Sequence, residues 1–404
     1  MTPVKTTIAE RVQQTVPQTQ FSVSPEPAIK PYGSTLIKVF GVGGGGCNAV
    51  ERMFRQQVKG VEYYAINTDI QHLARCQVAN RIPIGQKSTR GLGVGGEPEK
   101  GRMAAEESKA ELARLVEGAD MVFVTAGMGG GTGTGAISIA ARVARTLGAV
   151  TVAVVTTPFG FEIGKRQVNA REGLARLRPY TDTLITIPND RLLKIASRDL
   201  TLEMAFRLAD DVLRQGIQGI SELITEPGLI NVDFAHIRTV MQSGGGSLLS
   251  IGFGQGERKA QKAIEQALHH PLIDDIHLEN VSSIIVNFTA GSDLTFMEVM
   301  EALTDLQEKT NNQAEIIPGV ITDERMGDRV EVIMVLTGVG ATPVEVPKVA
   351  PRPVEKPEPL PQPVAAEAAR PVRILERFEQ SSPKEPATIQ ADLDIPAFLR
   401  RRVR

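Results

Sequence analysis

Two glycine-rich segments constrain the fold of this chain most strongly. The first runs from Gly41 to Asn48 (GVGGGGCN) and the second from Ala126 to Gly135 (AGMGGGTGTG). Each follows a short apolar run and precedes a helical pattern. Glycine has no Cβ, so backbone N–H groups and a helix N-terminus can approach a phosphate closely in such loops. The pattern therefore predicts a phosphate-rich ligand held at two strand-to-helix junctions.

The first loop alone leaves alternatives open. Gly41, Gly43 and Gly46 satisfy the dinucleotide fingerprint G-x-G-x-x-G, and Asp69 follows a second strand pattern. An NAD-dependent oxidoreductase is one alternative, and a purely structural tight turn is another. The second loop favours a nucleoside triphosphate, because a dinucleotide needs one pyrophosphate loop whereas two loops can hold a triphosphate from both ends. The chain has no Walker A sequence, which excludes a P-loop enzyme.

Apolar runs that read as strands alternate with amphipathic helical stretches over the first half of the folded chain. This alternation predicts an α/β domain with a doubly wound parallel sheet. The expected strands are 36–40, 62–66, 121–125, 150–156 and 183–187, with helices such as 104–116 and 136–147 between them.

A helical apolar stripe at 201–225 predicts one long helix of roughly 37 Å, enough to cross a domain. After it, the pattern predicts a smaller α+β domain. Its expected strands are 247–253, 281–288, 315–321 and 330–336, and its expected helices are 257–268 and 296–309. The predicted organisation is a nucleotide domain at 35–200, a central helix and loop at 201–231, and a second domain at 232–340.

Both ends of the chain have a different composition. Residues 1–34 are polar with scattered prolines and predict a disordered extension. Residues 341–390 are dense in proline, which predicts an extended linker. The last segment, 391–404, combines the apolar cluster at 393–399 with four arginines and predicts a docking peptide. An inert charged tail is the alternative for this segment.

Composition excludes several classes of protein. The net charge of -2, without aromatic and basic clusters in the body of the chain, argues against nucleic-acid binding. No apolar run reaches the roughly 18 residues of a membrane span, and residues 1–30 lack the apolar core of a signal peptide. We therefore expect a cytoplasmic protein without a direct membrane span. Two cysteines and five scattered histidines provide neither a disulfide framework nor a structural zinc site.

The segment GGGTGTG at 129–135 resembles the signature loop of the tubulin/FtsZ family. Further similar stretches follow in family order at 67–69, 91–96, 158–162, 188–190 and 231–234. The resemblance covers about 35–340 and recurs at 393–399, which is similar to the family's C-terminal partner-binding peptide. It implies a GTPase that polymerises head to tail with copies of itself and acts at the mid-cell division site. Residues 391–404 would then bind division proteins or membrane anchors.

The resemblance also implies a site for GTP or GDP with Mg²⁺. Asp69 would approach the γ-phosphate and Mg²⁺, Glu162 and Arg166 the ribose and phosphates, and Asn189 and Asp211 the base. A carboxylate suits guanine, since it can accept from both N1–H and the N2 amino group. Taken singly, these charged residues also suit a turn or a solvated helix face. The full set is Gly43, Gly44, Gly45, Asn48, Asn67, Asp69, Gly95, Gly96, Gly129, Gly130, Gly131, Thr132, Gly133, Thr134, Glu162, Arg166, Asn189 and Asp211.

In this family, the loop after the long helix projects onto the nucleotide of the next subunit and couples hydrolysis to polymerisation. Here that loop is 225–233, and the resemblance assigns catalysis to Asn231, Asp233 and the residue three places later. That residue is His236, where the family carries a second carboxylate. A second departure is Glu97, which places a negative charge near the phosphate loop. The histidine keeps open a nucleotide-binding filament protein with weak hydrolysis.

Overall fold

The computed structural model describes residues 35–339, apart from 57–59, 163, 195–200, 227, 243–245, 271–277 and 279–280. The described residues belong to one compact unit. The predicted extension at 1–34, the linker at 341–390 and the docking peptide at 391–404 lie outside them.

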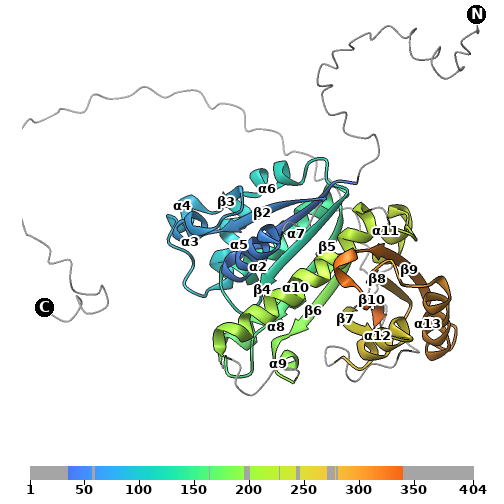
Figure 1. Cartoon of the computed structure of the whole chain (residues 1–404). Coiled ribbons are helices and arrows are strands. Elements are labelled where there is room, and N and C mark those ends of the chain that lie inside the picture. Colours follow the sequence, from blue (N-terminus) through green and yellow to red (C-terminus); the bar gives the residue numbers. More distant parts are fainter. Residues whose placement is uncertain are drawn as a thin grey trace, which may run out of the picture. The chain divides into compact units, whose positions relative to one another are not determined.

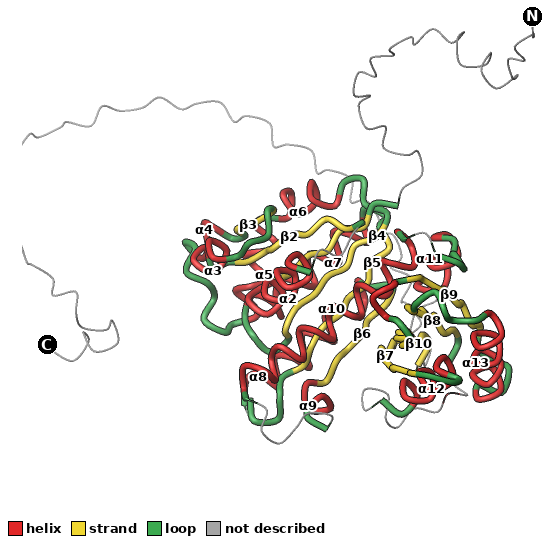
Figure 2. Tube along the Cα trace, viewed as in Figure 1, coloured by secondary structure: helices red, strands yellow, loops and turns green. Residues whose placement is uncertain are grey.

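The described strands form one ten-stranded sheet (Figures 1 and 2). Its first part is parallel throughout and has the order β3-β2-β1-β4-β5-β6. The chain builds outward from β1 in one direction and from β4 in the other, so β1 and β4 flank the topological switch point. Ligands of open α/β sheets bind at this point, beyond the carboxyl ends of the strands. The bounds are β1 (Ile37–Val42), β2 (Val61–Asn67), β3 (Asn80–Pro83), β4 (Met121–Gly127), β5 (Val150–Thr157) and β6 (Thr183–Pro188).

Helices cover both faces of this part of the sheet. One buried apolar cluster lies under α2, α10 and α11, and a second lies under α5, α6, α7 and α8. The predicted doubly wound α/β fold is therefore confirmed. The helices before α10 are α2 (Gly43–Arg55), α3 (Ile70–Arg75), α4 (Gln86–Thr89), α5 (Pro98–Glu107), α6 (Lys109–Val116), α7 (Thr132–Thr146), α8 (Lys165–Leu177) and α9 (Asn189–Leu192).

The predicted long helix is present as α10 (Leu202–Thr225). Thr201 caps it by accepting a hydrogen bond from the Met204 N–H over 3.3 Å. Its buried side chains, among them Leu213 and Ile217, pack in one cluster with strands of both parts of the sheet. The helix runs across the sheet beside α2 (Figure 1). Among the described residues, no helix combines the length and apolarity that crossing a membrane requires.

The second part continues the same sheet. β7 pairs with β6 through only two residue pairs, Leu184 with Gly246 and Ile185 with Ser247, and β10 lies antiparallel between β7 and β8. β9 pairs in parallel with β8 and is the outermost strand. The predicted domain boundaries stay predictions. The bounds are α11 (Phe234–Gln242), β7 (Gly246–Gln255), α12 (Lys259–Leu268), β8 (Ser283–Ala290), α13 (Phe296–Lys309), β9 (Glu315–Thr322) and β10 (Arg329–Val339).

One expected helix was wrong in its extent. The stretch 104–116 is divided between α5 and α6, with Ser108 at the break. The Ser108 hydroxyl accepts a hydrogen bond from the Gly85 N–H over 3.0 Å. The Ser108 backbone has φ -96° and ψ 15°, outside the helical region, and this local change separates the two helices. The strand β3 was not predicted, because its four residues include a proline and carry little strand signal.

Packing around α10 predicts a large difference between two leucine substitutions. Leu213 is 1% exposed on α10, whereas Leu147 is 52% exposed after α7. We expect Leu213→Ala to lower the free energy of unfolding by about 2–5 kcal/mol, because it leaves a cavity in the buried cluster that α10 forms with the sheet. Leu147→Ala should change it by less than about 1 kcal/mol. Urea denaturation of both variants measures the difference, and equal losses would contradict this account of the core.

Candidate nucleotide site

A cavity of about 710 Å³ lies at the carboxyl ends of the parallel strands. Its walls come from the loops after β1, β2, β4, β5 and β6 and from the first half of α10. The lining residues are Gly44, Gly45, Asn48, Asn67, Asp69, His72, Leu92, Gly93, Val94, Gly95, Gly96, Gly127, Met128, Gly130, Gly131, Thr132, Gly133, Thr156, Thr157, Pro158, Glu162, Arg166, Asn189, Phe206, Ala209 and Asp210.

The two glycine loops meet at this cavity. Gly43 has a φ of +72°, and a Cβ built on it would lie 2.5 Å from the Gly133 nitrogen. Only glycine permits this backbone contact without strain. Both loops open helices, α2 and α7, and neither helix has a side-chain hydrogen bond at its N-cap. The N–H groups of both first turns are therefore available to an anion, as phosphate binding requires.

Three predicted binding residues support the loops and do not line the cavity. Gly43 provides the contact with Gly133, and Gly129 turns the second loop with a φ of +99°. The Thr134 hydroxyl accepts a hydrogen bond from the Gly129 N–H over 2.8 Å. The side chain of Thr134 thus shapes the loop from behind. A sequence motif gives order along the chain but not which face of the loop a residue occupies.

The loop after β2 and the loop at 91–96 form another wall. Asp69 caps α3, since its Oδ1 accepts from the backbone N–H groups of Gln71 over 2.9 Å and His72 over 3.1 Å. The Thr68 hydroxyl lies 2.6 Å from that of Thr132, which ties this wall to the second glycine loop. Asn67 and Asp69 both line the cavity, as predicted.

The negative charge that we expected from Glu97 near the phosphate loop has a partner. Glu97 Oε1 lies 2.9 Å from Lys100 Nζ, one turn along α5, and both side chains are exposed. Glu97 is also absent from the cavity lining. The lysine offsets the carboxylate locally, so this departure adds little repulsion toward a phosphate.

The far side of the cavity is polar. Glu162 accepts a hydrogen bond from the Phe159 N–H over 3.0 Å and forms an ion pair with Arg166. Asn189 is 5% exposed, and its buried Oδ1 has no hydrogen-bond partner among the described residues. A buried acceptor without a partner is costly unless a ligand or water satisfies it. This orphan acceptor fits a ligand that carries donor groups, as a purine base does.

The prediction for Asp211 does not match its position. Asp211 is absent from the lining, 42% exposed, and accepts a hydrogen bond from Arg214 Nε over 2.8 Å. Its neighbour Asp210 lines the cavity and is 15% exposed. Consecutive residues of a helix point about 100° apart, so only one of the two carboxylates can face the ligand. Phe206 and Asp210 are four residues apart and therefore lie on the same face of α10. This spacing was the feature of the sequence that could have indicated Asp210 as the residue facing the ligand.

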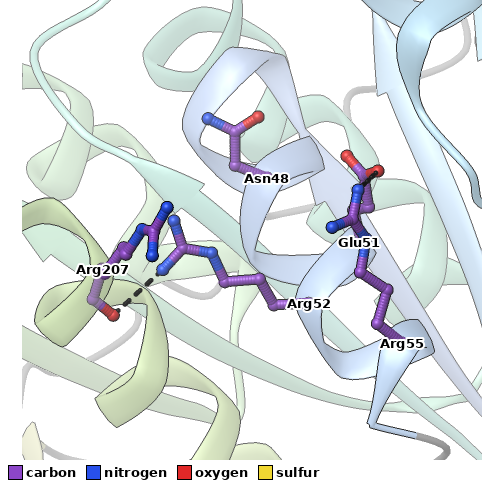
Figure 3. A pocket seen from close by; sticks show the side chains of 5 residues that line it. All are labelled: Asn48, Glu51, Arg52, Arg55 and Arg207. Atoms are coloured by element: carbon purple, nitrogen blue, oxygen red, sulfur yellow. Dashed lines mark hydrogen bonds and ion pairs between the residues drawn. The ribbon is translucent and has the colours of Figure 1, made fainter. Parts of the chain in front are cut away.

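Arg52 orients the Asp210 carboxylate. Its guanidinium lies 3.3 Å from Asp210 Oδ2. The same guanidinium donates to the Arg207 carbonyl oxygen over 3.1 Å, which joins α2 to α10 (Figure 3). Burial raises the pKa of Asp210 to about 6, an effect that Arg52 opposes and Asp211 reinforces. Arg52 and Arg207 also line a second pocket, which Figure 3 shows. Asn48 lines both this pocket and the main cavity.

Sequence reasoning missed His72 and Phe206, which both line the cavity. The buried Nδ1 of His72 has no hydrogen-bond partner among the described residues. His72 follows Asp69 by one helical turn, a spacing that places both on one side of α3. That spacing was visible in the sequence, but a single histidine at this position does not by itself indicate a binding site.

None of the predicted catalytic residues lines the cavity. Asn231 Oδ1 accepts from the Gly228 N–H over 2.6 Å, and Asp233 Oδ1 accepts from the Ala235 N–H over 3.0 Å. His236 Nε2 lies 2.7 Å from Glu315 Oε1. The loop follows the C-terminal end of α10, whereas Asp210 lies near its start, about 22 Å away along the helix axis.

Comparison with known proteins agrees with this geometry. Residues 36–197 match the GTPase domain of the Tubulin/FtsZ family, and residues 245–340 match the C-terminal domain of the FtsZ family. The chain is 43% identical over 374 residues to the cell division protein FtsZ of Buchnera aphidicola subsp. Acyrthosiphon pisum (strain APS), an alignment that covers 91% of this chain and 97% of that protein. This chain belongs to the tubulin/FtsZ family.

Solved structures share the fold of this chain. An FtsZ dimer from M. jannaschii superposes with a TM-score of 0.73 at 40% identity and covers 77% of this chain and 90% of that chain. CetZ1 from Haloferax volcanii has a TM-score of 0.65 at 18% identity, covers 76% of this chain and 96% of its own, and supports the fold alone. The family contains GTPases, and membership does not favour the NAD-dependent oxidoreductase.

The contact between the two glycine loops predicts unequal effects of two neighbouring substitutions. Gly43→Ala should lower the free energy of unfolding by at least about 2 kcal/mol, because alanine is strained at positive φ and its Cβ overlaps the Gly133 backbone. At Gly44 a Cβ meets nothing closer than His72 Nε2 at 3.9 Å, so Gly44→Ala should be neutral or slightly stabilising. Thermal unfolding without nucleotide measures both, and similar values would contradict the loop contact.

Proposed function

We propose that this chain binds and hydrolyses GTP and polymerises head to tail into filaments that form the cell-division ring. Each GTPase site is completed between adjacent subunits. The observation that carries this proposal is the separation of the two halves of the site: the cavity lies at the start of α10, and the loop with Asp233 lies beyond its end. A subunit cannot apply this loop to its own nucleotide, but a neighbour stacked along the helix direction can.

Exposed apolar side chains at both halves support a subunit contact. Leu92, at the cavity, is 77% exposed, and Leu229, in the loop after α10, is 74% exposed. Phe296 and Met297 at the start of α13 are 68% and 63% exposed. Apolar side chains that protrude beside polar functional groups are typical of protein–protein interfaces. The M. jannaschii relative is described as a dimer, which agrees with self-association.

We assign GTP or GDP to the cavity. The N–H groups at the starts of α2 and α7 hold the phosphates, and Glu162 and Arg166 lie toward the ribose. Asn189 and Asp210 read the base, so Asp210 takes the role that we predicted for Asp211. Asn189 offers an acceptor without a protein partner, and Asp210 offers a carboxylate held by Arg52.

Asp69 is the residue that would hold Mg²⁺. Its Oδ1 is occupied by two backbone N–H groups, whereas its Oδ2 has no hydrogen-bond partner among the described residues. Mg²⁺ in nucleotide sites takes one or two carboxylates together with phosphate oxygens and water, so one free oxygen beside the phosphates fits it. When bound, the ion supplies positive charge that offsets the charge developing on the phosphates.

Phosphoryl transfer needs positioning and charge stabilisation more than covalent chemistry. The N–H groups of the cavity stabilise the phosphate charge, and Asp233 of the adjacent subunit orients the attacking water. A second candidate, a nucleotide-binding filament protein with weak hydrolysis, is favoured by one observation: His236 stands where the family has a carboxylate. We further propose a cytoplasmic location at the division site, with residues 391–404 binding division proteins or a membrane anchor.

Assembly and hydrolysis measured together test the proposed function. With GTP and Mg²⁺, light scattering should rise above a threshold protein concentration, and phosphate release per subunit should rise at the same threshold. Asp233→Asn should keep the scattering and lose at least about tenfold in phosphate release, because it removes the charge that polarises water. Scattering with little phosphate release from the wild-type protein would support the weakly hydrolysing filament. Phosphate release without any threshold would contradict a shared site.

Substitution of the two neighbouring aspartates tests the base assignment. Asp210→Asn should lower GTP affinity about tenfold to hundredfold, since hydrogen bonds to a charged group contribute about 1.5–3 kcal/mol, and should change ATP affinity far less. Asp211→Asn is the matched control and should leave both affinities nearly unchanged. The ratio of GTP to ATP affinity removes any general effect on folding. If Asp211→Asn lowered the ratio of GTP to ATP affinity more than Asp210→Asn does, Asp211 and not Asp210 would be the residue that reads the base.

The same carboxylate predicts a pH dependence. Burial raises the pKa of Asp210 to about 6, and only the ionised carboxylate accepts both guanine donors. The ratio of GTP to ATP affinity should therefore fall as the pH drops through about 6 in the wild-type protein. Asp210→Asn should lack this dependence, because its amide does not titrate.

A further inference from the structure

The outermost strand β9 holds both the loop after α10 and the start of α11. The Leu229 N–H donates to the Val320 carbonyl oxygen over 2.8 Å, and the Val320 N–H donates to the Ile230 carbonyl oxygen over 3.2 Å. At the beginning of the same strand, Glu315 Oε1 lies 2.7 Å from His236 Nε2. The His236 side chain is thus in contact with a residue 79 positions away in the sequence.

The contact between His236 and Glu315 contributes little to stability. The two side chains are 49% and 54% exposed, and ion pairs at such positions are weakened by water and salt. Asp233 lies one turn earlier, where its carbonyl oxygen accepts from the His236 N–H over 3.0 Å. The pair therefore holds an imidazole on the exposed first turn of α11, beside the carboxylate that we propose to be catalytic.

We propose that Glu315 is a positioning residue, which holds His236 in the orientation and tautomer of a general base for GTP hydrolysis. The inference rests on the proposed function, because only a subunit contact brings His236 to a nucleotide. A carboxylate accepts a hydrogen bond only from a protonated ring nitrogen, so Nε2 carries the proton. In the neutral ring Nδ1 then has the free lone pair. Among the described residues, no hydrogen bond occupies Nδ1.

The step balances without a further reactant. The oxygen of water bonds to the γ-phosphorus while Nδ1 accepts one of its protons. The bond between this phosphorus and the bridging oxygen breaks, and its electron pair stays on the departing GDP. The Glu315 carboxylate stabilises the resulting imidazolium, as an acidic residue does for a catalytic histidine. The proton then passes to solvent. Together, His236 and Glu315 replace the carboxylate that the family places at position 236.

A double-mutant cycle tests this inference. Glu315→Gln keeps the size of the side chain, removes its charge and adds an amide N–H group that can donate to Nε2, which favours the tautomer with the proton on Nδ1. We expect about tenfold slower phosphate release per unit of polymer mass at saturating GTP, with little change in KM or in light scattering. His236→Asp restores the family's carboxylate and should hydrolyse GTP at least as fast as the wild type. In that background Glu315→Gln should keep or raise the rate, because it removes one of two neighbouring carboxylates.

Each other outcome overturns the inference. An equal loss in both backgrounds would show that Glu315 acts on folding or assembly and not through His236. Loss of polymer in Glu315→Gln would place Glu315 in the subunit interface. Glu257→Gln, which removes an exposed charge elsewhere in the second part, is the charge-matched control and should behave as the wild type. Absence of GTP-dependent polymer in the wild type would instead reject the proposed function, and the inference with it.

Discussion

The close backbone contact between the loops after β1 and β4 is the constraint on which the rest of the site depends. Gly43 and Gly133 approach so closely that a single Cβ would separate them. The contact is possible because β1 and β4 are neighbours in the sheet and end at the same edge. It brings the N-termini of α2 and α7 to one cavity, so that two sets of N–H groups can face one chain of phosphates. The loops after β2, β5 and β6 complete the cavity around this centre.

The helix α10 places the cavity and the loop with Asp233 near opposite ends of its length. Its first half lines the cavity through Phe206, Ala209 and Asp210, and its end leads into the loop that carries Asp233. Because its buried side chains pack against both parts of the sheet, the helix is a rigid spacer of fixed length. In the function that we propose, a site divided in this way works only between two subunits. Polymerisation and catalysis would then depend on the same contact, which would link assembly to nucleotide turnover.

Charged residues at and near the cavity and in the loop region after α10 have charged or hydrogen-bonding partners, and two of three such pairs join different elements. Arg52 on α2 holds the buried Asp210 on α10, and Lys100 offsets Glu97 within α5. Glu315 on β9 holds His236 on α11. In the first and third cases the partner is far away in the sequence. A substitution that looks unfavourable in one segment, such as histidine for a carboxylate, is accompanied by a charged group from another.

The sequence by itself determined the fold class and most of the cavity. Strand and helix periods are local, and glycine-rich loops after strands point to phosphates because the chemistry lies in the backbone of one short segment. The resemblance to the tubulin/FtsZ family, carried by short motifs, assigned Asn67, Asp69, Glu162, Arg166 and Asn189 to the site, and all five line the cavity. Only the tertiary structure decided that Asp210 and not Asp211 faces the cavity, that Thr134 supports its loop from behind, and that Glu315 meets His236. These facts depend on the rotation of a helix about its axis and on contacts across many residues, which packing sets and local sequence does not encode.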